Sequence, residues 1–313
     1  PVELSSGRVF VTASVGLTHC RDANADPGEI MRQADLAVDR AETDGGGRAC
    51  FFEPEMDMAL RARKSLEHDL REALANESFT MVYQPQANLR GVVTGVEALI
   101  RWSHPVRGPV SPAFFIPVAE ECGLIEEIGA YTLRQAFRDS RRWPQMTVAV
   151  NVSAAQLRNP QFPDLVGRML AEADVRAEQF ELEITEGVLL ADDDSTHDTL
   201  HKLRAMGFRL ALDDFGTGYS SLGYLRRYPV DKIKIDRSFV VNLGIERDAE
   251  AVVGAIVKLA RALNLKVIAE GVETEEQQMG LERAGCRHIQ GYLFSRPLTA
   301  ELVDHLVRAR VTS

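Results

Sequence analysis

Glu97-Ala98-Leu99-Ile100-Arg101-Trp102 places a carboxylate within an apolar run that begins at Val92. The run predicts a buried strand, and burying a lone carboxylate is costly unless it is paired or binds a metal ion. Glu97 therefore indicates that polar groups from elsewhere in the chain converge on it.

Polar side chains recur further along, at or near the ends of other strand-like runs. They are Asn151, Glu183, Asp213, Asp214, Lys234, Glu270 and Gln290. Any one of them alone is most simply a helix N-cap or a solvated surface residue. Their repetition on successive strand ends instead predicts one shared site.

From residue 79 onward, strand-like and helical patterns alternate, as in a mostly parallel α/β fold. Strands are expected near 80–84, 93–101, 146–151, 179–184, 207–213, 231–235, 265–270 and 287–290. Helices are expected near 112–121, 125–142, 162–173, 192–206, 247–263, 274–284 and 299–310. Eight strands predict a (β/α)8 barrel, whose chemistry lies at the C-terminal strand ends. An open doubly wound sheet is the alternative, but no glycine-rich turn follows an early strand.

The composition excludes several classes of protein. The 313 residues carry a net charge of -10, which argues against DNA or RNA binding because such proteins need a basic surface. The four cysteines are scattered without a CxxC pair, which is typical of reduced thiols in the cytoplasm. No apolar run approaches the roughly 20 residues that span a bilayer. The start at Pro1, without Met or a signal peptide, indicates a fragment that leaves room for an upstream sensor domain or membrane anchor.

Three parts follow one another along the chain: a small α/β fragment over 1–52, a linker helix over 53–78 and the barrel over 79–313. In the first part, a strand is expected over 8–16 and another over 50–52. Asp26-Pro27 predicts a helix start, and the glycines after Asp44 predict its end near Thr43.

The oxygen-rich set of side chains suits Mg²⁺ or Mn²⁺ rather than zinc. Adjacent Asp213 and Asp214 allow two ions to be bridged, which is the arrangement that clamps a phosphoryl displacement. Lys234 would supply a fixed cation for a phosphate oxygen or the nucleophile, and Glu270 a general base. Glycosidases also carry barrel carboxylates, but they explain neither Asn151 nor Lys234 nor the paired aspartates.

The region from about 66 to 310 resembles the EAL domain, a cyclic di-GMP phosphodiesterase. Nine blocks carry the resemblance in order: Tyr83-Gln84-Pro85, Glu97 to Trp102, Phe115 to Glu121, Asn151-Val152-Ser153, Glu183 to Glu186, Asp213 to Leu222, Lys234-Ile235-Asp236, Ala269 to Glu273 and Gln290 to Ser295. No single block is specific, but their ordered set is.

The resemblance implies a modified TIM barrel whose first strand is antiparallel to the rest. It implies hydrolysis of one phosphodiester of cyclic di-GMP to linear pGpG with two Mg²⁺ or Mn²⁺ ions. The implied metal ligands are Glu97, Asn151, Glu183, Asp213 and Asp214. Lys234 would hold the water and Glu270 would be the base. The implied substrate-binding residues are Gln84, Leu99, Arg101, Asp236, Glu273 and Gln290.

The resemblance also implies a loop, starting at Asp213, that couples the metals to a homodimer. Its members are Phe215, Gly216, Thr217 and Gly218, with Glu186 holding the loop in place. Position 187 is Gly, where many relatives have Ser, but the neighbouring Glu186 is retained.

The first fifty residues resemble the C-terminal part of a GGDEF, or diguanylate cyclase-like, domain. Val38 and Glu42 replace the usual Tyr and Lys, and the family's signature loop would lie upstream. This pattern predicts a truncated, inactive remnant. Two other functions stay open for the barrel: a catalytically silent cyclic di-GMP receptor that signals through a partner, and a hydrolase of another phosphodiester.

Overall fold

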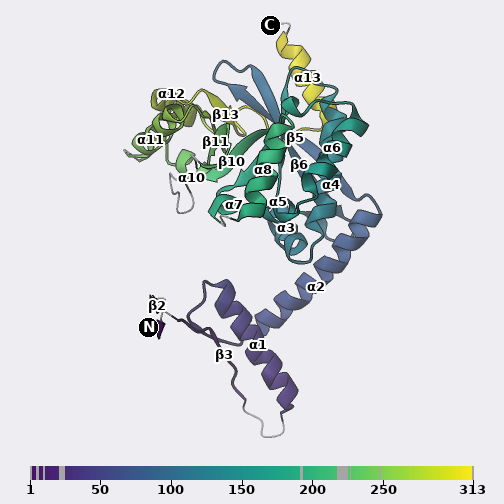
Figure 1. Ribbon diagram of the computed structural model, residues 1–313, viewed down its shortest axis with the longest axis vertical. Coiled ribbons are helices and arrows are strands. Elements are labelled where there is room, and N and C mark those ends of the chain that lie inside the picture. The colour runs from purple at the N-terminus through teal and green to yellow at the C-terminus, as the bar shows by residue number, and fades with distance from the viewer. Residues whose placement is uncertain are drawn as a thin grey trace. The chain divides into compact units, whose positions relative to one another are not determined.

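The structure is a computed structural model that describes residues 2–4, 7–9, 11–20, 25–190, 193–216, 225, 227–246 and 248–311. The chain divides into two compact units, Pro1–Asp69 and Leu70–Ser313. The boundary falls within the long helix α2 (Pro54–Ala75), which Figure 1 shows in blue. A helix thus covers most of the segment 53–78, and its last turns belong to the larger unit.

Before α2, the described residues of the smaller unit form one helix and two short two-stranded sheets. Its elements are β1 (Val2–Leu4), β2 (Gly7–Val9), β3 (Val15–Leu17), α1 (Pro27–Thr43) and β4 (Ala49–Phe51). The Asp26 carboxylate caps α1 by accepting from the Gly28 N–H, as the sequence predicts. The continuous strand expected over 8–16 is wrong, because β2 pairs antiparallel with β1 whereas β3 pairs parallel with β4.

The larger unit is a closed barrel. Its strands are β5 (Phe79–Asn88), β6 (Val93–His104), β7 (Gly108–Val110), β8 (Thr147–Asn151), β9 (Phe180–Thr185), β10 (Arg209–Phe215), β11 (Lys232–Ile235), β12 (Lys266–Ala269) and β13 (His288–Gln290). The order within the described residues is β5-β13-β12-β11-β10-β9-β8-β6, and pairing of β5 with β6 closes the ring. β7 extends the edge of β6 outside the ring.

Strand β5 runs against both of its neighbours, β6 and β13, whereas the remaining barrel strands pair in parallel. The modified TIM barrel with an antiparallel first strand is thus confirmed. The open doubly wound sheet is wrong, because such a sheet leaves two unpaired edges.

Helices follow the strands around the barrel (Figure 1). They are α3 (Pro112–Glu121), α4 (Ile125–Ser140), α5 (Ala154–Arg158), α6 (Phe162–Ala173), η1 (Ala177–Gln179), α7 (Glu186–Leu190), α8 (Asp194–Ala205), α10 (Arg237–Val240), α11 (Ala249–Ala262), α12 (Glu275–Ala284) and α13 (Ala300–Val311). The expected helices form close to their predicted ends. The short α5, α7 and α10 were not expected, because five residues or fewer carry no helical period.

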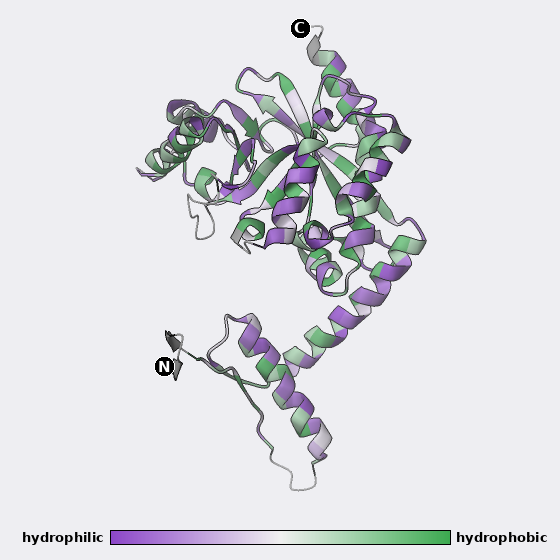
Figure 2. Cartoon of the chain, in the orientation of Figure 1, coloured by the Kyte–Doolittle hydropathy of each residue, from purple (hydrophilic) through white to green (hydrophobic). Residues whose placement is uncertain are grey.

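Hydrophobic and hydrophilic residues alternate along these helices in Figure 2, which is typical of helices that bury one face. Phe137 of α4 packs on Phe180 of β9 with ring centroids 4.5 Å apart, and Phe208 lies beside both rings. None of the helices in the described part of the chain combines the length and apolarity needed to cross a membrane.

Candidate active site

A buried lysine lies at the centre of the candidate site. Lys234, next to last in β11, is 1% exposed. Its ammonium nitrogen contacts four carboxylates: Glu270 at 2.6 Å, Glu183 at 2.7 Å, Asp213 at 3.1 Å and Glu97 at 3.6 Å. The sequence prediction that these five residues converge is therefore confirmed.

The register of the sheet brings these residues together. Asn151 in β8 pairs with Glu183 in β9, and Glu183 pairs with Ala211, two residues before Asp213 in β10. Glu97 in β6 pairs with Ala149, two residues before Asn151. Because residues two apart on a strand share a face, neighbouring strands present their polar side chains to one point.

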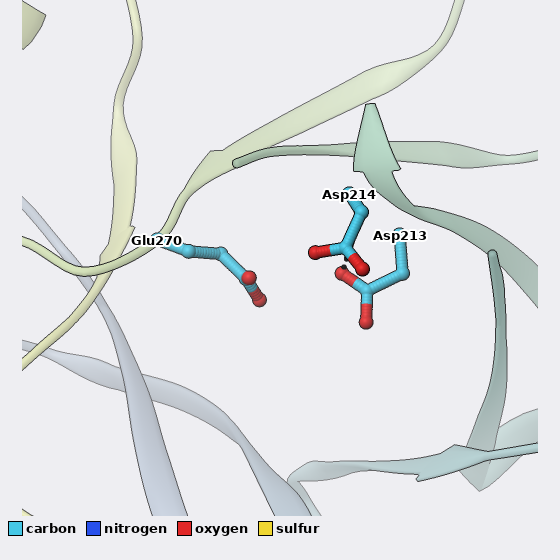
Figure 3. A group of neighbouring side chains, drawn as sticks. All are labelled: Asp213, Asp214 and Glu270. Atoms are coloured by element: carbon cyan, nitrogen blue, oxygen red, sulfur yellow. Dashed lines mark hydrogen bonds between the residues drawn. The ribbon is translucent and has the colours of Figure 1, made fainter. Parts of the chain in front are cut away.

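Asp213 and Asp214 occupy an irregularity in β10. Adjacent strand residues normally face opposite sides. Here the register with β11 shifts between Leu212 and Phe215, as in a β-bulge, and Asp214 has a left-handed φ of 53°. One carboxylate oxygen each from Asp213, Asp214 and Glu270 thereby lies within 4.8 Å of the others (Figure 3). The expected end of this strand at Asp213 is wrong, because β10 continues through the bulge to Phe215.

Charge in the site is unbalanced. Burial and the neighbouring Glu97 charge raise the pKa of Glu183 well above its usual value. Burial, reinforced by other carboxylates, raises the pKa of Glu270 to about 8 despite contact with Lys234. Burial would also raise the pKa of Glu97, but Lys234 and hydrogen bonds from Gln290 and Asn151 lower it overall. One ammonium does not offset this many carboxylates, so the site favours a further cation.

The donor set fits a divalent metal ion. The Oε1 atom of Glu183 is buried without a hydrogen-bond partner among the described residues, which leaves one lone-pair-bearing oxygen unsatisfied. Hard carboxylate oxygens are the ligands of Mg²⁺ and Mn²⁺. The cluster of Asp213, Asp214 and Glu270 offers three such oxygens close together.

Hydrogen bonds orient Glu97 within the site. The Asn151 side-chain amide donates to its Oε1 at 2.7 Å, and the Gln290 amide donates to its Oε2. Gln86 of β5 donates to the Gln290 carbonyl oxygen at 3.0 Å and so fixes which way that amide faces. Sequence reasoning missed Gln86, although it is 3% exposed and shares a strand face with Gln84.

Two cavities flank the carboxylates. One of about 260 Å³ is lined by Leu99, Arg101, Asn151 and Glu183 together with apolar residues of α3 and α4. The other, of about 220 Å³, is lined by Gln84, Glu97, Leu99, Arg237, Glu270, Gly271, Glu273, Gln290, Gly291 and Tyr292. Leu99 lines both cavities.

The predicted substrate contacts divide accordingly. Gln84, Leu99, Arg101, Glu273 and Gln290 all line one or both cavities. Asp236 is not among these lining residues; its carboxylate instead accepts from the Ser238 N–H as the cap of α10. Glu273 also forms an ion pair of 2.9 Å with Arg237.

The residues predicted to couple the loop are partly in place. Glu186, the first residue of α7, accepts a hydrogen bond from the Gly216 N–H at 3.3 Å. Phe215 is buried, and Gly216 has a φ of 97° with the Phe239 ring where a side chain would project. Thr217 and Gly218 lie outside the described residues.

The sequence profile of the EAL domain matches residues 67–297. The chain belongs to the EAL domain family. Among its relatives are two proteins of Pseudomonas aeruginosa. The bifunctional diguanylate cyclase/cyclic di-GMP phosphodiesterase MucR is 41% identical over 307 residues, covering 96% of this chain and 45% of MucR. The cyclic di-GMP phosphodiesterase NbdA is 39% identical over 316 residues, covering 99% of this chain and 40% of NbdA.

This EAL domain chain thus spans less than half the length of these curated relatives. A solved structure of the MucR phosphodiesterase in complex with c-di-GMP superposes with a TM-score of 0.73 at 44% identity. The match covers 76% of this chain and 99% of that one. The structural similarity therefore extends over the barrel as a whole.

Proposed function

We propose that the chain hydrolyses one phosphodiester bond of cyclic di-GMP and releases linear pGpG. The observation that carries the proposal is Lys234 enclosed by four carboxylates, two of which, Asp213 and Glu270, also lie close to Asp214. Family membership and the names of MucR and NbdA support this substrate over another phosphodiester.

In this proposal two Mg²⁺ or Mn²⁺ ions are held by Glu97, Asn151, Glu183, Asp213 and Asp214. When bound, such ions neutralise phosphate oxygens and favour ionisation of water. The Asn151 nitrogen already donates to Glu97, which leaves its Oδ1 as the ligand atom. The buried Glu183 Oε1, for which no hydrogen-bond partner is found among the described residues, would be a second ligand atom.

The protein side chains would then position the reactants. Lys234 holds the surrounding carboxylates in position and supplies a fixed positive charge near the attacking water. Glu270, whose pKa of about 8 falls once cations offset its neighbours, accepts the water proton. The water oxygen bonds to phosphorus and the bond to the 3′-oxygen breaks, with a proton passing to that leaving oxygen. Arg101 and Gln84 bind the dinucleotide from the two cavities.

The test is release of pGpG from cyclic di-GMP in Mg²⁺ or Mn²⁺, with Glu97→Ala as the control. We expect product from the wild type and none above background from the variant. Tight binding without turnover would replace the proposal with a silent receptor. Equal turnover of linear dinucleotides or cyclic mononucleotides would replace it with a hydrolase of broader substrate range.

We further propose that the chain consists of a GGDEF remnant over 1–52, a linker helix over 53–78 and the EAL barrel over 79–313. The alignment with bifunctional MucR includes 96% of this chain and so extends beyond the barrel, which supports a GGDEF origin of the first segment. Glu42 in place of the usual Lys argues that the remnant is inactive. A cytoplasmic homodimer coupled through the loop after Phe215, with a sensor domain upstream, completes the proposal.

A further inference from the structure

Helix α8, which connects β9 to β10, carries two histidines one turn apart. The Nε2 atoms of His197 and His201 lie 3.2 Å apart, and the ring centroids are separated by 4.3 Å. His201 is exposed and His197 is partly exposed. Neither residue lines the two cavities beside the carboxylates. The pair therefore lies outside the proposed active site, and the proposed phosphodiesterase reaction gives it no role.

The separation of the two nitrogens matches a chelate. Imidazole nitrogens bind Zn²⁺ at about 2.0–2.1 Å, so two of them at tetrahedral or octahedral angles lie about 2.9–3.4 Å apart. The observed 3.2 Å is within this range. In the protein without metal the same two nitrogens are at hydrogen-bond distance.

Acidic residues lie near the pair on α8, and basic residues lie in the last turn of the same helix. Asp194 and Asp198 precede the histidines by three residues each on α8, and residues three or four apart share a helix face. The buried Tyr228 packs edge-on against His197 with centroids 5.6 Å apart, which restrains that ring. Imidazole ligands select Zn²⁺, Ni²⁺ and Cu²⁺ over Mg²⁺, so the ligand type differs from that of the carboxylate site.

We propose that His197 and His201 form a second metal site, specific for a borderline transition-metal ion such as Zn²⁺ or Cu²⁺, with water completing the coordination. The bound ion would clamp successive turns of α8. This helix joins the strand that bears Glu183 to the strand that bears Asp213. The inference rests on the histidine geometry and does not depend on the proposed hydrolysis.

Electron paramagnetic resonance of protein loaded with one equivalent of Cu²⁺ tests the site, in buffer with excess Mg²⁺. The carboxylate cluster offers oxygen ligands, so hyperfine coupling to two imidazole nitrogens reports the histidine pair. We expect two nitrogens in the wild type, and at most one in His197→Asn and in His201→Asn. His305→Asn, which removes an exposed histidine of α13, is the matched control and should leave the spectrum unchanged.

A Zn²⁺ titration by calorimetry provides the second readout. Loss of a direct ligand should weaken this binding by about tenfold or more, since even outer-shell changes cost 10–100-fold. Circular dichroism establishes that the variants fold. Cu²⁺ bound through oxygens alone in the wild type, or Zn²⁺ affinity unchanged in both His197→Asn and His201→Asn, would overturn the proposal.

Discussion

Glu181 of β9 and Lys232 of β11 form a lower layer in the barrel interior, and Glu183 and Lys234 of the same strands form an upper layer. The two layers differ in the number of carboxylates around the lysine. In the lower layer, Lys232 meets Glu181 at 2.5 Å, and both residues are largely buried. Two residues further along the same strands, Lys234 meets Glu183 and three more carboxylates. Both layers contain an ion pair between a lysine of β11 and a glutamate of β9, across the intervening strand β10.

What separates the layers is charge balance. Among the described residues Lys232 forms an ion pair with one carboxylate, that of Glu181, so this pair matches one positive charge with one negative charge. The upper layer has an excess of carboxylates and an unsatisfied Glu183 oxygen. A buried ion pair with balanced charges has a structural role, whereas a buried site with surplus carboxylates attracts a cation. Substitutions at four places test this difference between the structural layer and the cation-binding layer.

Replacing Lys234 should have the largest effect. Lys234→Met removes the one ammonium among four carboxylates, and breaking a buried pair in this way costs about 3–5 kcal/mol. We expect urea denaturation to show this loss in chelator and a partial recovery in Mn²⁺, which offsets the same charges. Turnover should fall by about 10²–10³-fold even when the protein is folded. Unchanged turnover would exclude Lys234 from the reaction.

Asp213→Asn should come next. The amide keeps the shape but removes a charged ligand from the cluster with Asp214 and Glu270. Mn²⁺ affinity and pGpG release should fall together, by about 100-fold, the upper end of what outer-shell changes cost. Calorimetry and product analysis on the same sample check this. Full activity with weakened Mn²⁺ binding would contradict the assignment of this ligand.

Gln86→Leu should have a smaller effect. Gln86 reaches the site only through Gln290, whose amide then donates to Glu97. We expect Mn²⁺ affinity to fall about tenfold. Gln86→Asn should restore that affinity if its shorter amide still reaches Gln290. A loss of stability with unchanged Mn²⁺ affinity would show that Gln86 is purely structural.

The lower layer should tolerate exchange. Replacing the balanced pair with apolar residues, Lys232→Met together with Glu181→Leu, is expected to be neutral or mildly stabilising. Turnover should stay within about twofold, because neither residue touches the carboxylate cluster. Lys232→Met alone should destabilise the protein, and Mn²⁺ should not recover that loss. Recovery of the lost stability by Mn²⁺ would contradict the proposed difference between the two layers.

Much of the barrel follows from the sequence because its strands and helices are long enough to show their periods. The alternation from residue 79 onward predicts the closed ring, and the polar strand ends predict the convergence of Glu97, Glu183 and Lys234. The antiparallel direction of the first strand came only from the family resemblance, since a strand's period contains no information about direction.

Other features depend on geometry that no local pattern encodes. The left-handed backbone at Asp214 brings two adjacent carboxylates to one side, and this follows from a bulge against β11. Gln86 gains its place in the site only when β5 pairs with β13. The lower ion pair between Lys232 and Glu181 likewise requires the barrel to be closed before it can be recognised.

The central claim is that the surplus of carboxylates around Lys234 binds the divalent ions on which hydrolysis depends. It is tested most directly by following pGpG release from cyclic di-GMP while Mn²⁺ is added to chelator-treated protein. We predict no product before addition, product that rises and saturates with Mn²⁺, and a return to background when chelator is restored. Product formation in chelator, or none at any Mn²⁺ or Mg²⁺ concentration, would contradict the claim.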